Sequence, residues 1–155
     1  EHFAVAPLRP LTPRQYAISA ALAAGDEAFD QAASAVRADR YCDLENRSAG
    51  LTESLDRRTA NFQSSASEAL FMSNNSAVQQ LVAPAVNNLV VRLVAIPETD
   101  KMVETAVWTV LGRAPDGDER SHLGQWFESR TQDRPGACSQ LVWALLTSAE
   151  FRFNH

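Results

Sequence analysis

The sequence predicts an all-α fold, an irregular or orthogonal multi-helix bundle around a buried C-terminal helix. Three observations support this prediction: helix start signals recur along the chain, no segment alternates apolar and polar residues over strand length, and the last helix is apolar over most of its circumference. Such a helix belongs inside a bundle, so we expect the segment from Ser139 to Thr147 to be the most buried helix. Its apolar stripe consists of Cys138, Leu141, Val142, Leu145 and Ala149, widened by Trp143 and Leu146.

The length of 155 residues indicates one helical domain, residues 1–155. Its formal net charge is −5. A domain of this size buries about two thirds of the surface of its unfolded chain. The 14 lysines and arginines are scattered, which argues against a nucleic-acid partner. The longest apolar run, 89–96, is interrupted by Arg92 and is far shorter than the roughly 20 residues of a membrane span. The chain opens on Glu1, and we expect a processed form or the C-terminal part of a longer protein.

The N-terminal segment predicts an extended arm followed by a helix. Residues 1–10 contain two prolines and are expected to lie on the bundle surface. Thr12 is the expected N-cap, Pro13 takes the first helical position, and Gln15 completes a capping box. Gly25 is the expected end of this helix.

A second, longer helix is expected from a cap at Asp26 to about Asn46. A broken segment that contains Gly50 is expected after it, followed by a short helical turn at residues 51–55. The stripe of the long helix is rich in alanine, which favours close packing between helices. Its members are Phe29, Ala32, Ala33, Val36 and Leu44.

The middle of the chain predicts three helical segments. Ser65 and Glu68 form a second capping box, which starts a short helix that stops at Asn74. Helix resumes at Ser76, and Pro84 is expected to kink or divide the helical region after it. The next segment carries a helical stripe of Val86, Leu89, Val90, Leu93 and Val94.

Two further helices precede the last one. The first is expected to open at Thr99 or Asp100 and to stop at Gly112. Asp116 is expected to cap the second, with Glu119 three residues later. The inner face of this second helix is expected to be Leu123, Trp126 and Phe127.

The end of the chain is expected to close the core. Pro135 and Gly136 punctuate the chain before the last helix. We expect that helix to end at residues 148–150, after which Phe151 and Phe153 pack onto the bundle.

Two cysteines, Cys42 and Cys138, are too few and too far apart for a disulfide framework or a Cys-x-x-Cys motif. Each suits a packed, small apolar position. A disulfide between them is the alternative, because connectivity does not follow from sequence.

Three stretches of the chain, 8–15, 64–75 and 141–155, resemble one family. They are similar to the C-terminal region of large exported planctomycete proteins, a domain of unknown function often joined in one chain to a cytochrome c-like domain. Arg14 departs from that pattern, because an acidic residue is common there. The resemblance implies an exported location, periplasmic or at the cell surface, and other domains of the parent chain as partners. It brings no catalytic residues.

A fainter likeness runs from residue 107 to residue 151. The segment 111–116, Trp126 and the segment 148–151 are similar to a short helical repeat of bacterial surface and linker-type proteins. Both likenesses point to architecture rather than to catalysis.

The strongest candidate ligand site is an anion site at Arg57, Arg58 and Ser65. The N-terminal end of a helix offers free backbone N–H groups, and two arginines before it suit a carboxylate, sulfate or phosphate. The alternative is that an arginine pairs internally with Asp56 or Glu68 and holds the loop.

Other reactive side chains have structural interpretations. His122 and Glu119 make a weak metal pair and suit a solvated helix face. The serines at 64, 65 and 67 lack a nucleophile elbow, and Asp116 with Asp118 lacks the remaining ligands of a calcium loop. The chain has three tryptophans, Trp108, Trp126 and Trp143. We expect them to pack in the core; the alternative is a platform on which sugars stack.

These observations favour a non-catalytic structural or interaction domain of a multidomain exported protein. They assign no catalytic residue, metal or cofactor, and the isolated domain is not expected to be an enzyme. One alternative is a binding module for an anionic glycan or another anion. A further alternative is a part of an enzyme that upstream domains complete.

Overall fold

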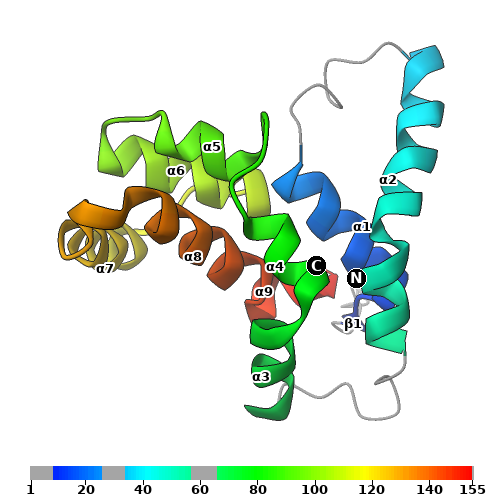
Figure 1. Cartoon of the computed structure of the whole chain (residues 1–155). Helices are drawn as coiled ribbons and strands as arrows, with labels where there is room; N and C mark the ends of the chain where they lie inside the picture. Colours follow the sequence, from blue (N-terminus) through cyan, green and yellow to red (C-terminus); the bar gives the residue numbers. More distant parts are fainter. Residues whose placement is uncertain (1–8, 26–33, 57–65, 155) are drawn as a thin grey trace, which may run out of the picture.

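The computed structural model describes residues 9–25, 34–56 and 66–154. They form a multi-helix bundle, which confirms the predicted all-α class. Its elements are β1 (Arg9–Pro10), α1 (Pro13–Ala24), α2 (Ser34–Asp56), α3 (Ala66–Asn74), α4 (Ser76–Val82), α5 (Leu89–Val94), α6 (Thr99–Leu111), α7 (Gly117–Glu128), a 3-10 turn (Thr131–Asp133), α8 (Arg134–Leu146), α9 (Ala149–Arg152) and β2 (Phe153–Asn154). Figure 1 shows α1 and α2 on one side, α5 to α8 on the other, and α4 and α9 between them.

The core lies where the two sides meet. α1 packs against α2, α4, α5 and α6, while α8 packs against α4, α5, α6 and α9. Within the described ranges, no helix combines the length and the apolar character that crossing a bilayer requires. The largest fully buried side chains include Tyr16, Leu55, Met72, Leu89, Leu93, Met102 and Leu146.

The start of α1 confirms the predicted capping box. The side chain of Thr12 accepts a hydrogen bond from the backbone N–H of Gln15 at 3.3 Å, and the side chain of Gln15 accepts from the backbone N–H of Thr12 at 2.9 Å. Gly25 ends the helix as predicted. A Cβ atom there would lie 2.6 Å from the carbonyl oxygen of Ala21, so this position requires glycine. The predicted arm before residue 9 lies outside the described residues.

α2 differs from the prediction because it runs through Gly50 without a break. The predicted end near Asn46 and the separate turn at 51–55 are therefore wrong. A glycine inside a helix costs about 1 kcal/mol relative to alanine, and burial of a continuous helical face offsets it. That face consists of Leu44, Ser48, Leu51 and Leu55, all of them buried.

The stripe predicted for this helix is right at Leu44 and wrong at Val36, which is 45% exposed. The remaining stripe positions, 29, 32 and 33, and the predicted cap Asp26 lie outside the described residues.

The predicted interruptions between α3, α4 and α5 are confirmed. α3 ends at Asn74, and the side chain of Asn75 caps α4 by accepting from the backbone N–H groups of Ala77 at 2.9 Å and Val78 at 3.2 Å. α4 then ends before Pro84.

α5 begins later than the predicted stripe. Asn88 is its N-cap, and its side chain accepts from the backbone N–H of Val91 at 3.1 Å and donates to the carbonyl of Ala83 at 2.7 Å. The helix therefore starts at Leu89. Val86 lies before it and is 91% exposed, so its predicted place in the buried stripe is wrong.

Both ends of the next connection agree with the prediction. α6 begins at Thr99 and ends before Gly112, which adopts a left-handed conformation with φ of 70°. Asp116 caps α7 by accepting from the backbone N–H of Glu119 at 2.8 Å, and the Glu119 carboxylate accepts from the backbone N–H of Asp116 at 2.9 Å. This capping box is the observed role of the acidic turn.

α8 begins earlier than predicted, with Pro135 and Gly136 inside its first turn. Its N-cap is Asp133, whose carboxylate accepts from the backbone N–H of Gly136 at 3.0 Å. A Cβ atom on Gly136 would lie 2.1 Å from that carboxylate, so glycine permits this cap. Proline is tolerated in a first turn because its missing N–H has no partner there.

The prediction that residues 139–147 form the most buried helix is wrong. Trp143 and Leu145 are half-buried and Ala144 is exposed, because the neighbours of α8 cover one side of it. α6 buries as many residues as α8 over the same length of 13, and α1 buries five of its 12. The buried residues of α6 are Met102, Val103, Ala106, Val107 and Val110.

The chain end closes the core through Phe151. α8 stops at Leu146, and Ser148 caps the separate helix α9, so the single helix predicted to end at 148–150 is wrong. Phe151 contacts Tyr16 edge to face, with ring centroids 5.6 Å apart. Phe153 is half-buried in β2, which pairs antiparallel with β1.

Replacing Phe151 with alanine should lower the free energy of unfolding by about 2 kcal/mol. The ring is partly buried, so the loss should be smaller than the roughly 3 to 5 kcal/mol of a core phenylalanine. Urea denaturation measures the change. Leu70→Ala is the control, because Leu70 is 64% exposed and its loss should stay within about 0.5 kcal/mol. Equal losses in the two variants would contradict the closing role of Phe151.

Candidate functional site

The predicted anion site lies outside the described residues. Arg57, Arg58 and Ser65 all belong to the segment 57–65. α3 begins at Ala66. This agrees with the predicted capping box of Ser65 and Glu68, which places the first helical residue directly after Ser65. The anion site stays a prediction.

The strongest charged cluster of the described residues is centred on Arg113. Its guanidinium donates two hydrogen bonds of 2.7 Å to the Glu119 carboxylate and two of 2.6 and 2.7 Å to the Glu150 carboxylate. These bidentate pairs join the α6–α7 turn to the start of α7 and to α9. Arg113 is therefore a clamp between segments that are distant in sequence.

Hydrogen bonding in this cluster stabilises its charged forms. Bonds from Arg113 are the main cause that lowers the pKa of Glu119 to about 2, and the two carboxylates raise the pKa of Arg113 above its usual range. Arg113 and Glu119 therefore stay charged at neutral pH. Arg113 donates to both carboxylates, which makes the cluster architectural.

The sequence alone did not predict this clamp. Arg113 and Glu150 are 37 residues apart in the sequence. The only local signal is Glu119, whose spacing from Asp116 indicates a capping box and nothing more. Only the packing of α9 against α6 brings the second carboxylate to the arginine.

The remaining reactive candidates take structural roles or lie outside the described side chains. His122 is exposed on α7, and its Nδ1 lies 2.8 Å from the carbonyl oxygen of Asp118, so the predicted solvated helix face is confirmed. In the described ranges, no three His, Cys, Asp or Glu side chains lie close enough together to hold a metal ion. The side chains of the serines at 64, 65 and 67 are outside the description.

The three tryptophans differ from one another. Trp126 and Trp143 pack against the core, as predicted, and Trp126 also contacts Phe127 edge to face at 4.8 Å. The guanidinium of Arg130 lies 4.4 Å from the centre of a Trp126 ring. Trp108 is 52% exposed on α6, so its predicted core position is wrong.

Both cysteines are free thiols. Cys138 is buried and Cys42 is exposed, so the alternative of a disulfide between them is wrong, and the packed position predicted for Cys42 is wrong as well. Burial raises the pKa of the Cys138 thiol, which fits the predicted role of a small apolar core residue.

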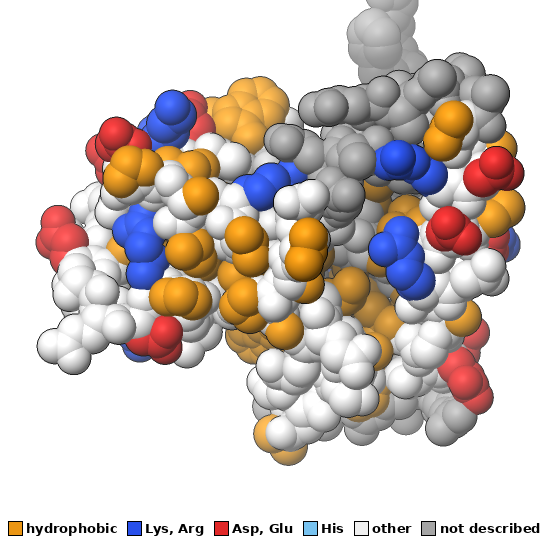
Figure 2. Space-filling view, turned by 45° about the horizontal axis from the view of Figure 1, so that its top comes forward, with side chains coloured by type: hydrophobic (Ala, Val, Ile, Leu, Met, Phe, Trp, Pro, Cys, Tyr) orange, Lys and Arg blue, Asp and Glu red, His pale blue; other side chains and the backbone are white. Residues whose placement is uncertain are grey.

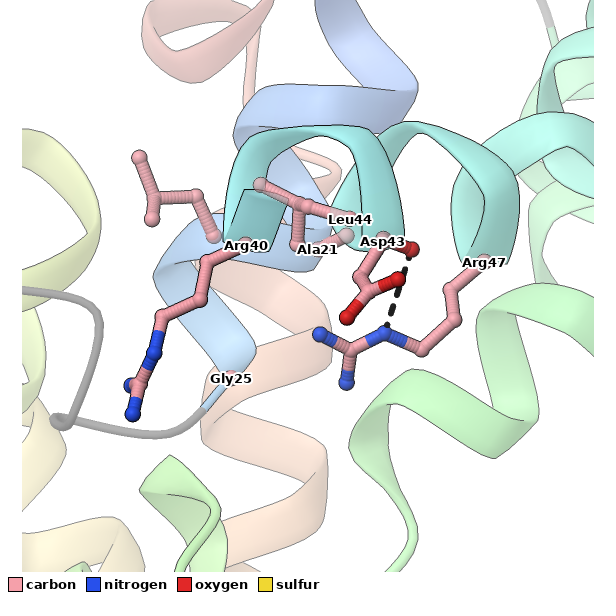
Figure 3. A pocket seen from close by; sticks show the side chains of 7 residues that line it. Ala21, Gly25, Arg40, Asp43, Leu44 and Arg47 are labelled. Carbon is pink, nitrogen blue, oxygen red and sulfur yellow. Dashed lines mark hydrogen bonds between the residues drawn. The ribbon is translucent and has the colours of Figure 1, made fainter. Parts of the chain in front are cut away.

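A pocket of about 250 Å³ lies between the last turn of α1 and the middle of α2. Arg40, Asp43 and Arg47 project from one face of α2 around it, and Gly25 ends the opposite wall (Figure 3). The apolar residues that line the pocket are Ala21, Leu22 and Leu44.

An exposed apolar surface lies on the other side of the bundle. Figure 2 shows apolar side chains spread over the half of the molecule that carries α5, α6 and α8, with charged side chains around them. In and before α5, the described apolar residues that are exposed are the run Ala83–Val86, Val91 and Ala95. We call these residues the α5 surface. Exposed apolar surface of this kind, rimmed by polar groups, is typical of interaction sites.

No protein-family model matches this chain, and comparisons with curated proteins and with solved structures found no match. The family resemblance and the exported location therefore remain predictions from the sequence.

Replacing Arg113 with methionine should lower the free energy of unfolding by about 1 to 3 kcal/mol, because two carboxylates lose their charged donor. Arg113→Lys should recover less than half of the loss, since an ammonium cannot make two bidentate pairs. Chemical denaturation measures both. The control is Arg120→Met, which removes one bond of 3.4 Å to Glu104 and should change little. The clamp is refuted if the Arg113 and Arg120 variants melt alike.

The clamp should also weaken in acid. The pKa of Glu119 is lower in the folded protein, so its contribution is fully present above about pH 4.5 and is lost as the pH falls towards about 2. Because a third of the side chain meets solvent, we expect a contribution of about 1 to 2 kcal/mol. Denaturation of wild type and Glu119→Gln across this range measures it. A stability difference that does not shrink between pH 4.5 and 2 would contradict the low pKa.

Proposed function

We propose that this chain is a non-catalytic interaction domain of a multidomain exported protein, and that its α5 surface docks onto another domain of the same polypeptide. The observation that carries the proposal is the exposure of Val86, which presents 91% of its surface to solvent at an apolar tip. When a partner covers such a branched apolar side chain, its removal from water stabilises the complex.

The backbone around Val86 presents that tip firmly. Asn88 bonds back to the carbonyl of Ala83 at 2.7 Å, and its backbone N–H donates to the carbonyl of Ala85 at 3.1 Å. The buried Asn88 thus ties the turn to the start of α5. The turn is therefore already ordered before a partner binds, and this order reduces the entropy lost on binding.

The Arg113 cluster supports an architectural role. Arg113 donates to Glu119 and to Glu150, and this clamp joins the α6–α7 turn to α7 and α9. The resemblance to the C-terminal domain of exported planctomycete proteins supports a parent chain with further domains. Those domains are the partners that we propose for the α5 surface.

The proposal predicts that residues 83–95 exchange amide hydrogens more slowly in the full-length polypeptide than in the 155-residue chain alone. Val86→Asp should restore fast exchange in the full-length protein, because a carboxylate at the tip resists burial. The matched control is Val36→Asp on α2, where an exposed valine lies outside the α5 surface. Hydrogen-exchange mass spectrometry measures all four proteins. Equal exchange of residues 83–95 with and without the other domains would refute this docking surface.

A further inference from the structure

The α1–α2 pocket brings two arginines and one aspartate together. Arg40, Asp43 and Arg47 lie three and seven residues apart on α2, on one face of the helix. An acid four residues before a base favours an ion pair. Arg47 instead donates from Nε to the backbone carbonyl of Asp43 at 3.4 Å, the bond drawn in Figure 3.

Among the described residues, no hydrogen bond or ion pair engages the Asp43 carboxylate or the Arg40 guanidinium. Within the described part of the chain, no ion pair joins Asp43 to either arginine. Figure 3 shows Arg47 turned back beside Asp43, while Arg40 extends away from it on the other side. Seven helical residues span about 10.5 Å, so the two arginines leave α2 about two turns apart, with Asp43 between them.

The chemistry of these groups selects a class of ligand. Guanidinium groups bind carboxylates through paired hydrogen bonds, and the two arginines with one aspartate leave a net positive charge. A free carboxylate such as Asp43 accepts hydrogen bonds from hydroxyl groups. The apolar side chains of Leu22 and Leu44 line the same pocket and suit a ligand with a flat face of C–H groups. A sugar ring that carries a carboxylate offers all three features.

The hollow also continues along the helices. A second pocket of about 250 Å³ shares Ala21 and Arg47 with the first and extends to α4, where Gln80 lines it. Each pocket is near the lower limit of small-molecule sites, which hold about 300 Å³ or more. One sugar unit per pocket fits this division.

We propose that this hollow binds an acidic saccharide, with the uronate carboxylate at Arg40, ring hydroxyls at Asp43 and Arg47, and a neighbouring sugar unit towards Gln80. The site lies on α1 and α2 and goes beyond the proposed docking role of the α5 surface, so either can fail without the other.

Titration of the 155-residue protein with glucuronate, followed by amide chemical shifts, tests the site. We expect shifts at the end of α1 and in the middle of α2, with a dissociation constant on the order of 1 mM. Acetate supplies the carboxylate alone and glucose supplies the hydroxyls alone, and each should bind about tenfold more weakly. A disaccharide that contains glucuronate should bind more tightly than the monosaccharide, and Gln80→Ala should reduce that gain.

Variants assign the roles of the three charged groups. Arg40→Gln and Arg47→Gln should each weaken glucuronate binding about tenfold, because each removes a charge-assisted hydrogen-bond donor. Lys101→Gln, an exposed cation on α6, is the control and should change nothing. Asp43→Asn should leave acetate binding equal or tighter while the preference for glucuronate over acetate disappears. Melting temperatures show that each variant is folded.

Three results would overturn the proposal. The first is no saturable shift with glucuronate. The second is equal binding of acetate and glucuronate, which would indicate attraction of any anion. The third is a loss of binding in Lys101→Gln as large as that in Arg40→Gln.

Discussion

The architecture depends on a buried tyrosine at the meeting point of its two halves. Tyr16 on α1 is almost fully buried, and its hydroxyl donates to the carbonyl of Leu146 at 3.0 Å, where α8 ends. Its ring also packs against Phe151 of α9. A buried hydroxyl requires a partner, and here the partner lies 130 residues away. This contact fixes the α1–α2 pair against the later helices.

Elsewhere in the described structure, many polar side chains cap the N-termini of helices or connect segments through ion pairs. Thr12, Asn75, Asn88, Asp116 and Ser148 each cap the helix directly after them. Each cap satisfies backbone N–H groups that a helix start leaves without partners. The Arg113 clamp then adds a connection between the α6–α7 turn and α9. Such a scaffold is stiff at its turns, which suits a domain that presents surfaces to partners.

The two proposed sites use different physical properties of that scaffold. The α5 surface offers apolar area around Val86, where burial supplies the free energy of association. The α1–α2 pocket offers charge and hydrogen bonding, since no ion pair joins Arg40 to Asp43 in the described structure. A domain that docks by one face keeps the other face open to a ligand. Under both proposals, the protein binds on two sides of its core.

The sequence by itself determined the helices whose limits depend on local chemistry. Capping at Thr12 and Asp116 and the left-handed stop at Gly112 act through residues within one turn, so a local pattern predicts them. Tertiary packing decided the rest. It carries α2 through Gly50, because a buried face outweighs one glycine, and it leaves Val86 in solvent. It also brings Glu150 to Arg113 and places the end of α1 beside Arg40, since contacts between distant segments have no local signal.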